Sequence, residues 1–241
     1  AIGTSINFLT VLLVLIHSIT SISYLNESSY LNFMQYSKLV DFFEKILSKN
    51  KRLIKTLFIS NLLKKSNAED LEILIPMMQG NIFPEWDERK LGVSTKYVIK
   101  ALKLSTGFDD IENRWKKLGD LGEVAEEVIS KKKQSTLFFQ PLTIKKVYDN
   151  IVKLSSLSGD KSVDRKIQLI SELYSLANGN EAKYITRFIL EDLRIGVGDS
   201  SIRDAIAWAY LDTGFLVKCK ECKEITTIEN KCLFCNEKLE K

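Results

Sequence analysis

Apolar residues recur at helical spacing along most of the chain from Ser37 onward. In segments 37–49, 51–65 and 68–78 they fall at positions i, i+3, i+4 and i+7, which places them on one face of an α-helix. Short polar joints separate the segments, and residues 79–94 form the longest irregular stretch. The pattern therefore predicts an all-α fold, a multi-helix bundle. Further helices are expected near 94–105, 108–118, 121–133, 143–157, 162–178, 181–194 and 200–211.

The N-terminal stretch differs from these helical segments because it is apolar and uncharged. Residues 1–26 carry no charged side chain, and residues 6–23 are nearly long enough to span a bilayer. They lack the basic n-region of a signal peptide, contain several Ser and Thr, and have no Lys or Arg anchor before Lys38. Because the chain starts with Ala and Met34 directly precedes the first patterned helix, we favour an over-extended start or a fragment, with 1–33 as an extension. Membrane anchoring by residues 6–23, or a signal sequence, is the less favoured alternative.

Composition and charge limit the classes of function that the chain can have. The 241 residues are 45% apolar, enough for one sizeable core with appendages. Residues 131–166 hold nine Lys or Arg and three acids, a candidate basic face, although such runs are also typical of a solvated surface. The only histidine, His17, lies in the apolar N-terminal stretch, so His-based acid–base or triad chemistry has no other candidate. The common phosphate-binding loop motifs are also absent, and we therefore do not expect catalysis within this chain.

All four cysteines fall in the last 23 residues, with the spacing Cys-x2-Cys, nine residues, Cys-x2-Cys. This spacing lets two turns present four thiolates tetrahedrally to zinc, while disulfides or free thiols are the alternative. With four sulfur ligands and no open position, such a zinc ion is structural. Residues 214–241 are thus predicted to be a small zinc ribbon, which has too little core to fold without its metal. The predicted ligands are Cys219, Cys222, Cys232 and Cys235.

Glycines interrupt the helical pattern at "WKKLGDLGEVAEEV", residues 115–128. Gly119 and Gly122 allow a positive φ or the close approach of another group. The helix that starts at Leu121 would then offer free N–H groups and a positive dipole end to an anion, with Lys116 beside it. A simple turn between two helices explains the same residues.

Two later joints share this chemistry. In "LSGDKSVDRKI", Gly159 precedes a capping Ser162, and Lys166 lies in the first helical turn, where the dipole disfavours a cation unless an anion is near. In "LRIGVGDSSIRDAI", a helix end with Arg194 is followed by two glycines and another helix. Two helix–glycine loop–helix units that flank a basic segment resemble paired hairpins that grip duplex DNA by its backbone. Glycines that only end helices are the alternative.

Several segments together resemble one family. "LIPMMQGNIFPEWDERKLGVSTKYVIKAL", "WKKLGDLGEVAEEV", "LTIKKVYDNIVKLSSLSGDKSVDRKIQLISELY" and "EAKYITRFILEDLRIGVGDSSIRDAIAWAY" occur in the order and spacing of the N-terminal DNA-binding domain of archaeal and eukaryotic ATP-dependent DNA ligases. The similarity covers about residues 35–211, and "GDLG" and "LRIGV" are its most specific motifs. It implies a helical domain, here 34–213, that holds nicked duplex DNA through the minor groove and phosphates.

The resemblance also implies roles for individual residues. Carried over by position, one backbone grip is Gly119, Asp120, Leu121 and Gly122, and the matching second grip is Arg194, Gly196 and Gly198. A DNA-facing helix opens with Thr143 and Lys145, and a further phosphate contact consists of Gly159, Ser162 and Lys166.

The chain departs from the family after Tyr210. In the family this domain leads into a nucleotidyltransferase domain with an adenylated lysine in Lys-x-Asp-Gly, a motif absent from these 241 residues. We therefore expect ATP and Mg²⁺ to act only through a catalytic domain absent from this chain, which alone is inactive. Nicked duplex DNA is the expected partner, with a separate catalytic chain or a clamp protein as a second, and the expected location is cytoplasmic and nucleoid-associated. The competing hypothesis is a helical interaction scaffold, membrane-tethered, that uses the ribbon to bind a protein.

Overall fold

The structure is a computed structural model that describes residues 33–84, 86–132, 141–159, 161–211, 216–227 and 231–239. The apolar segment 6–23 lies outside these ranges, so the expectation about its start site or anchoring stays untested. In the described ranges, no helix combines the length and apolar character needed to cross a bilayer.

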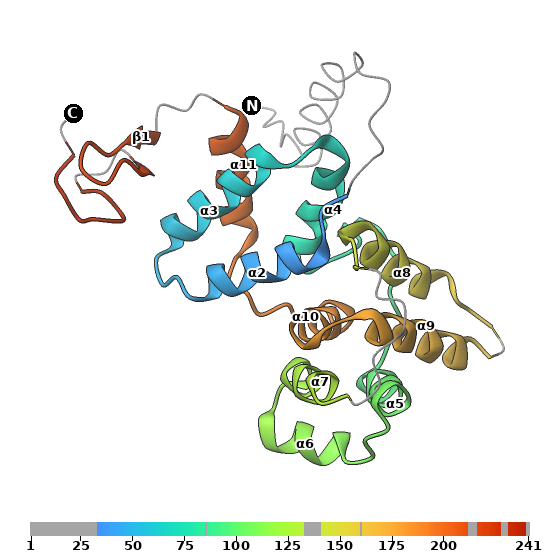
Figure 1. The fold of residues 1–241 in the computed structure, drawn as a ribbon. Coiled ribbons are helices and arrows are strands. Elements are labelled where there is room, and N and C mark those ends of the chain that lie inside the picture. The colour runs from blue at the N-terminus through green and yellow to red at the C-terminus, as the bar shows by residue number, and fades with distance from the viewer. Residues whose placement is uncertain are drawn as a thin grey trace, which may run out of the picture.

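The predicted all-α fold is confirmed, since each expected helical segment overlaps one helix of the described chain (Figure 1). Outside the ribbon, the elements are α2 (Tyr36–Leu47), α3 (Arg52–Lys65), α4 (Ala68–Gln79), α5 (Thr95–Thr106), α6 (Ile111–Leu118), α7 (Leu121–Ser130), α8 (Ile144–Ser156), α9 (Ser162–Leu176), α10 (Gly179–Ile189) and α11 (Asp199–Tyr210).

Several boundaries differ from the prediction by a few residues, and the largest difference is at the end of α10. Helix α10 ends at Ile189 and not at residue 194, because Glu191 and Arg194 adopt left-handed φ values of 56° and 55°. Arg194 is therefore not at a helix end but in the loop between α10 and α11. The capping of α9 also differs from the prediction. Lys161, with φ 59°, is the N-cap residue in place of Ser162, which is the first residue of the helix, and no side chain caps it.

One continuous hydrophobic cluster joins the ten helices, with Tyr174, Tyr184 and Phe188 among its largest fully buried side chains. Helix α10 packs against α7, α11 packs against α3, and α5 packs against α9. The approach of α10 to α7 depends on Gly179, where an ideal Cβ would lie 2.0 Å from Ser130 Oγ. The loops before α2 and α8 are also joined, since Tyr36 N–H donates to Leu142 O at 2.8 Å.

The cysteine-containing segment forms a separate small element. Strands β1 (Leu216–Lys218) and β2 (Ile225–Thr227) pair antiparallel, with Val217 opposite Thr226. A second, isolated bridge joins Lys231 to Lys238. In the described chain, the main hydrophobic cluster contains no residue of this element.

Candidate nucleic-acid interface and metal centre

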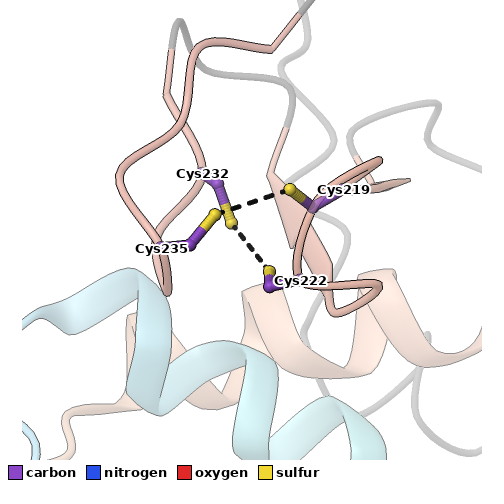
Figure 2. A group of neighbouring side chains, drawn as sticks. All are labelled: Cys219, Cys222, Cys232 and Cys235. Carbon is purple, nitrogen blue, oxygen red and sulfur yellow. Dashed lines mark hydrogen bonds between the residues drawn. The ribbon is translucent and has the colours of Figure 1, made fainter.

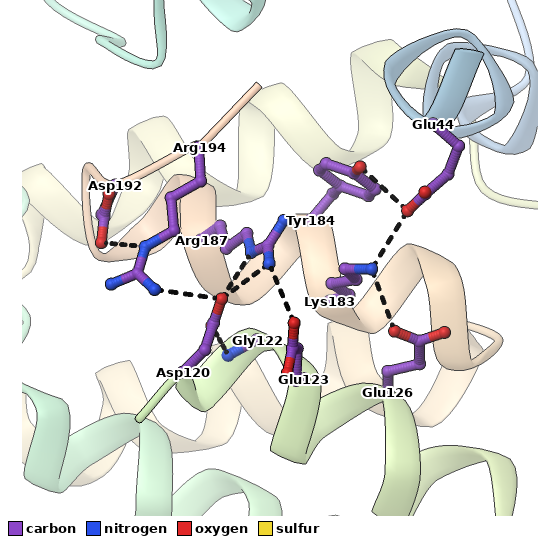
Figure 3. Close-up of polar contacts among 10 residues, drawn as sticks. All are labelled: Glu44, Asp120, Gly122, Glu123, Glu126, Lys183, Tyr184, Arg187, Asp192 and Arg194. Carbon is purple, nitrogen blue, oxygen red and sulfur yellow. Dashed lines mark hydrogen bonds and ion pairs between the residues drawn. The ribbon is translucent and has the colours of Figure 1, made fainter. Parts of the chain in front are cut away.

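The two predicted glycine loops meet at Asp120. This residue is the N-cap of α7, and its Oδ1 accepts from Gly122 N at 2.7 Å. Its Oδ2 accepts from Arg187 of α10 at 2.6 and 3.2 Å and from Nη1 of Arg194 at 3.3 Å (Figure 3). One carboxylate thus joins the start of α7, the end of α10 and the loop that follows α10.

The environment keeps Asp120 ionised. Burial raises the pKa of its carboxyl, but hydrogen bonds and charge from Arg187, the Gly122 N–H group and Arg194 outweigh burial, so the net pKa is lowered. The side chains of Asp120 and Arg187 are 10% and 8% exposed, whereas that of Arg194 is 47% exposed. Arg194 is therefore half exposed to solvent, whereas Arg187 is enclosed by the protein.

The two glycines of "GDLG" act differently. Gly119 ends α6 with φ 73°, and no described residue lies within 4 Å of an ideal Cβ there, so this glycine serves the turn. Gly122 lies in the first turn of α7, where an ideal Cβ would come within 2.9 Å of Arg187 Cγ and 3.0 Å of Asp120 Oδ1. The close approach expected at this loop exists, and in the protein itself the approaching group is Arg187.

A cavity of about 260 Å³ lies at this junction. Its walls bring together residues from α5, α6, the start of α7, α10 and the following loop. Of the predicted site residues, five line it, and Lys116 is exposed in the last turn of α6 nearby in sequence. The lining residues are Thr95, Trp115, Gly119, Asp120, Leu121, Gly122, Arg187, Leu190, Asp192 and Arg194.

The glycines after Arg194 do not line this cavity. Gly196 has φ 62°, and Lys55 of α3 holds the loop by donating to Ile195 O at 3.2 Å and Gly196 O at 3.1 Å. Gly198 is the N-cap of α11, and no described residue lies within 4 Å of an ideal Cβ there. Lys55 was not predicted, because nothing in α3 alone indicates a partner that is more than a hundred residues away.

The remaining predicted residues occupy other helix starts. Thr143 is the N-cap of α8 and accepts from Lys146 N at 3.2 Å, while its contact with DNA stays a prediction. Lys145, in the same turn, pairs with Asp149 at 3.0 Å. Gly159 turns the chain before α9 with φ 81°, and no described residue lies within 4 Å of an ideal Cβ there.

Lys166 has an internal partner. Its side chain is on the second turn of α9, the residue is 8% exposed, and Nζ donates to Leu91 O at 2.7 Å and Gly92 O at 3.1 Å. Burial lowers the pKa of this ammonium. The cation near the start of α9 is therefore satisfied by two carbonyl groups of the loop before α5, and a phosphate contact would require it to leave them.

The four cysteines converge as their spacing predicts (Figure 2). All four Sγ atoms lie within 4.8 Å of one another, and the pairs Cys219–Cys235 and Cys222–Cys232 are each 3.6 Å apart. No disulfide joins them in the structure. A Zn–S bond of about 2.3 Å in a tetrahedron separates the sulfur atoms by about 3.8 Å, so the cluster has the size of a four-thiolate metal site.

The two halves of this cluster repeat one geometry. Cys219 N–H donates to Glu224 O at 2.9 Å, and Cys232 N–H donates to Glu237 O at 2.7 Å. The residue after each second cysteine is left-handed, with φ 61° at Lys223 and 66° at Asn236. Burial raises the pKa of the Cys232 thiol, but N–H groups of Cys235 and Phe234 lower it to about 6. Two matched turns thus point four sulfur atoms at one centre, and these four cysteines could bind a metal ion.

Comparison with known proteins identifies the helical part. The family model of the DNA ligase N terminus matches residues 35–207. The chain belongs to this family, the N-terminal domain of ATP-dependent DNA ligases.

Archaeal relatives agree. The chain is 45% identical over 180 residues to a DNA ligase of Methanosphaera stadtmanae and 41% identical over 179 residues to one of Thermococcus onnurineus. A DNA ligase of Nanoarchaeum equitans is 38% identical over 179 residues. Each match covers 73% of this chain but only 31–32% of the ligase. The chain therefore spans about a third of the length of these relatives, and the four cysteines lie beyond the matched family region.

Proposed function

We propose that helices α2–α11, the helical body, bind nicked duplex DNA through phosphates and the minor groove, as the DNA-binding part of an ATP-dependent DNA ligase. The observation that supports this most directly is the meeting of the loop of Gly119 and Gly122 with Arg194 at one cavity, where Arg194 is half exposed beside the first turn of α7. A helix N-terminus and an arginine are both suited to a phosphate oxygen. Lys116, Thr143, Lys145, Gly159, Gly196 and Gly198 are proposed as further contacts.

Adenylyl transfer is assigned to other residues. The 241 residues contain no Lys-x-Asp-Gly motif, so a nucleotidyltransferase domain outside them would use ATP and Mg²⁺. We propose that this domain, in the same or a separate chain, acts on the nick that the helical body holds, with a clamp protein as a further partner and the nucleoid as the location. Labelled ATP should leave this chain unmodified, and a covalent adenylate on any lysine would contradict the assignment.

DNA binding is tested by fluorescence anisotropy with a labelled nicked duplex. Because phosphate contacts carry no base information, two unrelated competitor sequences should compete within a few-fold of each other. Arg194→Gln should weaken binding and lower the log–log salt slope by about 0.9, the loss of one phosphate contact. A wild-type chain that binds no duplex at low salt, or prefers one sequence a hundredfold, would refute the proposal.

We also infer that the cysteine cluster binds zinc. Four sulfur ligands at this spacing leave no open coordination position, so the ion is structural. Protein prepared without chelator should contain one zinc ion per chain. Cys222→Ser should lose it, whereas Thr227→Ser in the same ribbon should keep it. Absence of zinc from the wild-type chain would count against the inference.

A further inference from the structure

Asp120 occupies an unexpected place, because a carboxylate at the entrance of a phosphate-binding site should repel the ligand. Its two oxygen atoms are already used by the protein. Oδ1 caps α7 through Gly122 N, and Oδ2 receives Arg187 and Arg194. A carboxylate with these partners accepts hydrogen bonds only, so it has no donor for a phosphate oxygen.

The charges around Asp120 are arranged asymmetrically. Arg187 is enclosed and reaches Asp120 with two nitrogen atoms, so this pair is nearly neutral on its own. Arg194 uses only Nη1 towards Asp120, at 3.3 Å, and Nε towards the exposed Asp192, at 2.6 Å. Glu123, whose side chain is 50% exposed, lies 3.8 Å from Arg187. Among the described residues, the Nη2 group of Arg194 has no partner, so its donors are available beside the cavity.

The contact between Asp120 and Arg194 also restricts a long side chain. An arginine in solution loses rotamer freedom when it binds a phosphate, which weakens binding. Here the backbone of Arg194 is left-handed, the side chain crosses to the start of α7, and Asp120 is itself held by Arg187 (Figure 3). The guanidinium is thus placed before any ligand arrives.

From this geometry we propose that Asp120 is a positioning residue for DNA binding: it holds Arg194 beside the first turn of α7 and does not itself contact DNA. Gly122 supports the same arrangement of Asp120, Arg187 and Arg194, because a Cβ at residue 122 would push Arg187 away from Asp120. The proposal rests on the proposed DNA binding, and it predicts an effect of unusual sign. Removing the negative charge of Asp120 should weaken the binding of a polyanion.

The test compares Asp120→Asn, Arg194→Gln and the double variant with the wild-type chain, using a fluorescein-labelled nicked duplex. Asn keeps the side-chain size and an oxygen for the α7 cap. Asp120→Asn should bind the duplex about tenfold more weakly than the wild-type chain, which corresponds to the loss of one charge-assisted contact. The slope of the logarithm of its binding constant against the logarithm of the salt concentration should fall in magnitude by about 0.9. In the Arg194→Gln background, the same substitution should have no weakening effect.

Glu191→Gln is the matched control. Glu191 is exposed, close to Arg194 in sequence, and makes no ion pair in the described part of the chain. Its substitution removes the same charge, so binding should stay within about twofold of wild type or become tighter. Thermal melts by circular dichroism set a temperature at which every variant is folded. If Asp120→Asn does not fold, Asp120→Glu replaces it, and that variant should bind more weakly although its charge is unchanged.

The outcomes separate the two proposals. A wild-type chain that binds no DNA overturns the proposed function. If the wild type binds and Arg194→Gln weakens it, but Asp120→Asn binds as well or better, DNA binding stands and the positioning role is wrong. The positioning role is also wrong if Asp120→Asn is equally harmful with and without Arg194, or if folded Asp120→Glu binds like the wild type.

Discussion

At the residue scale, Gly119 and Gly122 can be distinguished by one substitution. Asn tolerates a left-handed φ, and Gly119 has open space, so Gly119→Asn should change the free energy of unfolding by less than about 0.5 kcal/mol. At Gly122 the φ is ordinary, but a side chain would collide with Arg187 and Asp120. Gly122→Asn should therefore destabilise by about 1–3 kcal/mol through overpacking. Urea unfolding measures both, and equal losses would contradict this distinction.

Asp120 also predicts a pH dependence. The folded state lowers the pKa of its carboxyl, so the unfolded chain binds the proton more readily. Its contribution to stability is complete above the unfolded pKa, near 3.9, and is lost as the pH falls through the lower folded-state pKa. Thermal melts of wild type and Asp120→Asn between pH 7 and about pH 2 should therefore converge at the acid end. A difference in melting temperature that stays constant over this range would show that the charge is not responsible.

At the element scale, the crossing of α7 and α10 depends on one missing side chain. In Gly179→Ala the new Cβ would lie 2.0 Å from Ser130 Oγ and 2.9 Å from Glu126 O, and about 2–3 kcal/mol of destabilisation is expected. Ser130→Ala alone should be mild. The double variant should recover only part of the loss, because the Glu126 carbonyl remains. Full recovery would show that the Ser130 hydroxyl alone sets the helix distance.

The ribbon turns offer a stabilising change. Lys223 and Asn236 adopt φ 61° and 66° after the second cysteine of each pair. Glycine removes the steric penalty of about 1 kcal/mol that a side chain such as lysine bears there, and Asn bears less of it. The Lys223→Gly variant should therefore keep its metal at higher chelator concentrations than the wild-type chain. The Asn236→Gly variant should show a smaller increase in this resistance. The chelator concentration that removes half of the metal measures both, and a looser Lys223→Gly site would contradict the argument.

At the scale of the whole molecule, the helical body and the ribbon should unfold independently. The hydrophobic cluster that joins α2 to α11 includes no ribbon residue of the described chain. Removal of the metal by a chelator should therefore abolish hydrogen-exchange protection in the ribbon. The melting temperature of the helices should stay within about 2 °C of its value before chelation, because the free energy of unfolding of the helices should hardly change. DNA affinity should also survive chelation. A large drop in helical stability would show that the ribbon braces the bundle.

Much of the architecture was predictable from local patterns. Helical periodicity located the ten helices of the described residues, and Cys-x2-Cys spacing identified the cysteine cluster, because both signals lie within a few turns of the chain. Errors arose at ends: α10 stops at Ile189, although the apolar pattern continues, because the following loop turns left-handed. The pair Asn178 and Glu181 forms a capping box that could have placed the start of α10 correctly.

The sequence by itself determined the fold class, the cysteine site and the glycine loops, since each depends on residues close together in the chain. Only the tertiary structure decided the partners of the charged groups. Arg187 stands 67 residues from Asp120, and Lys166 stands 75 residues from Leu91, so no local pattern could assign either contact. Burial then decided their roles, because an enclosed charge needs a fixed partner whereas a half-exposed one, such as Arg194, remains able to bind a ligand.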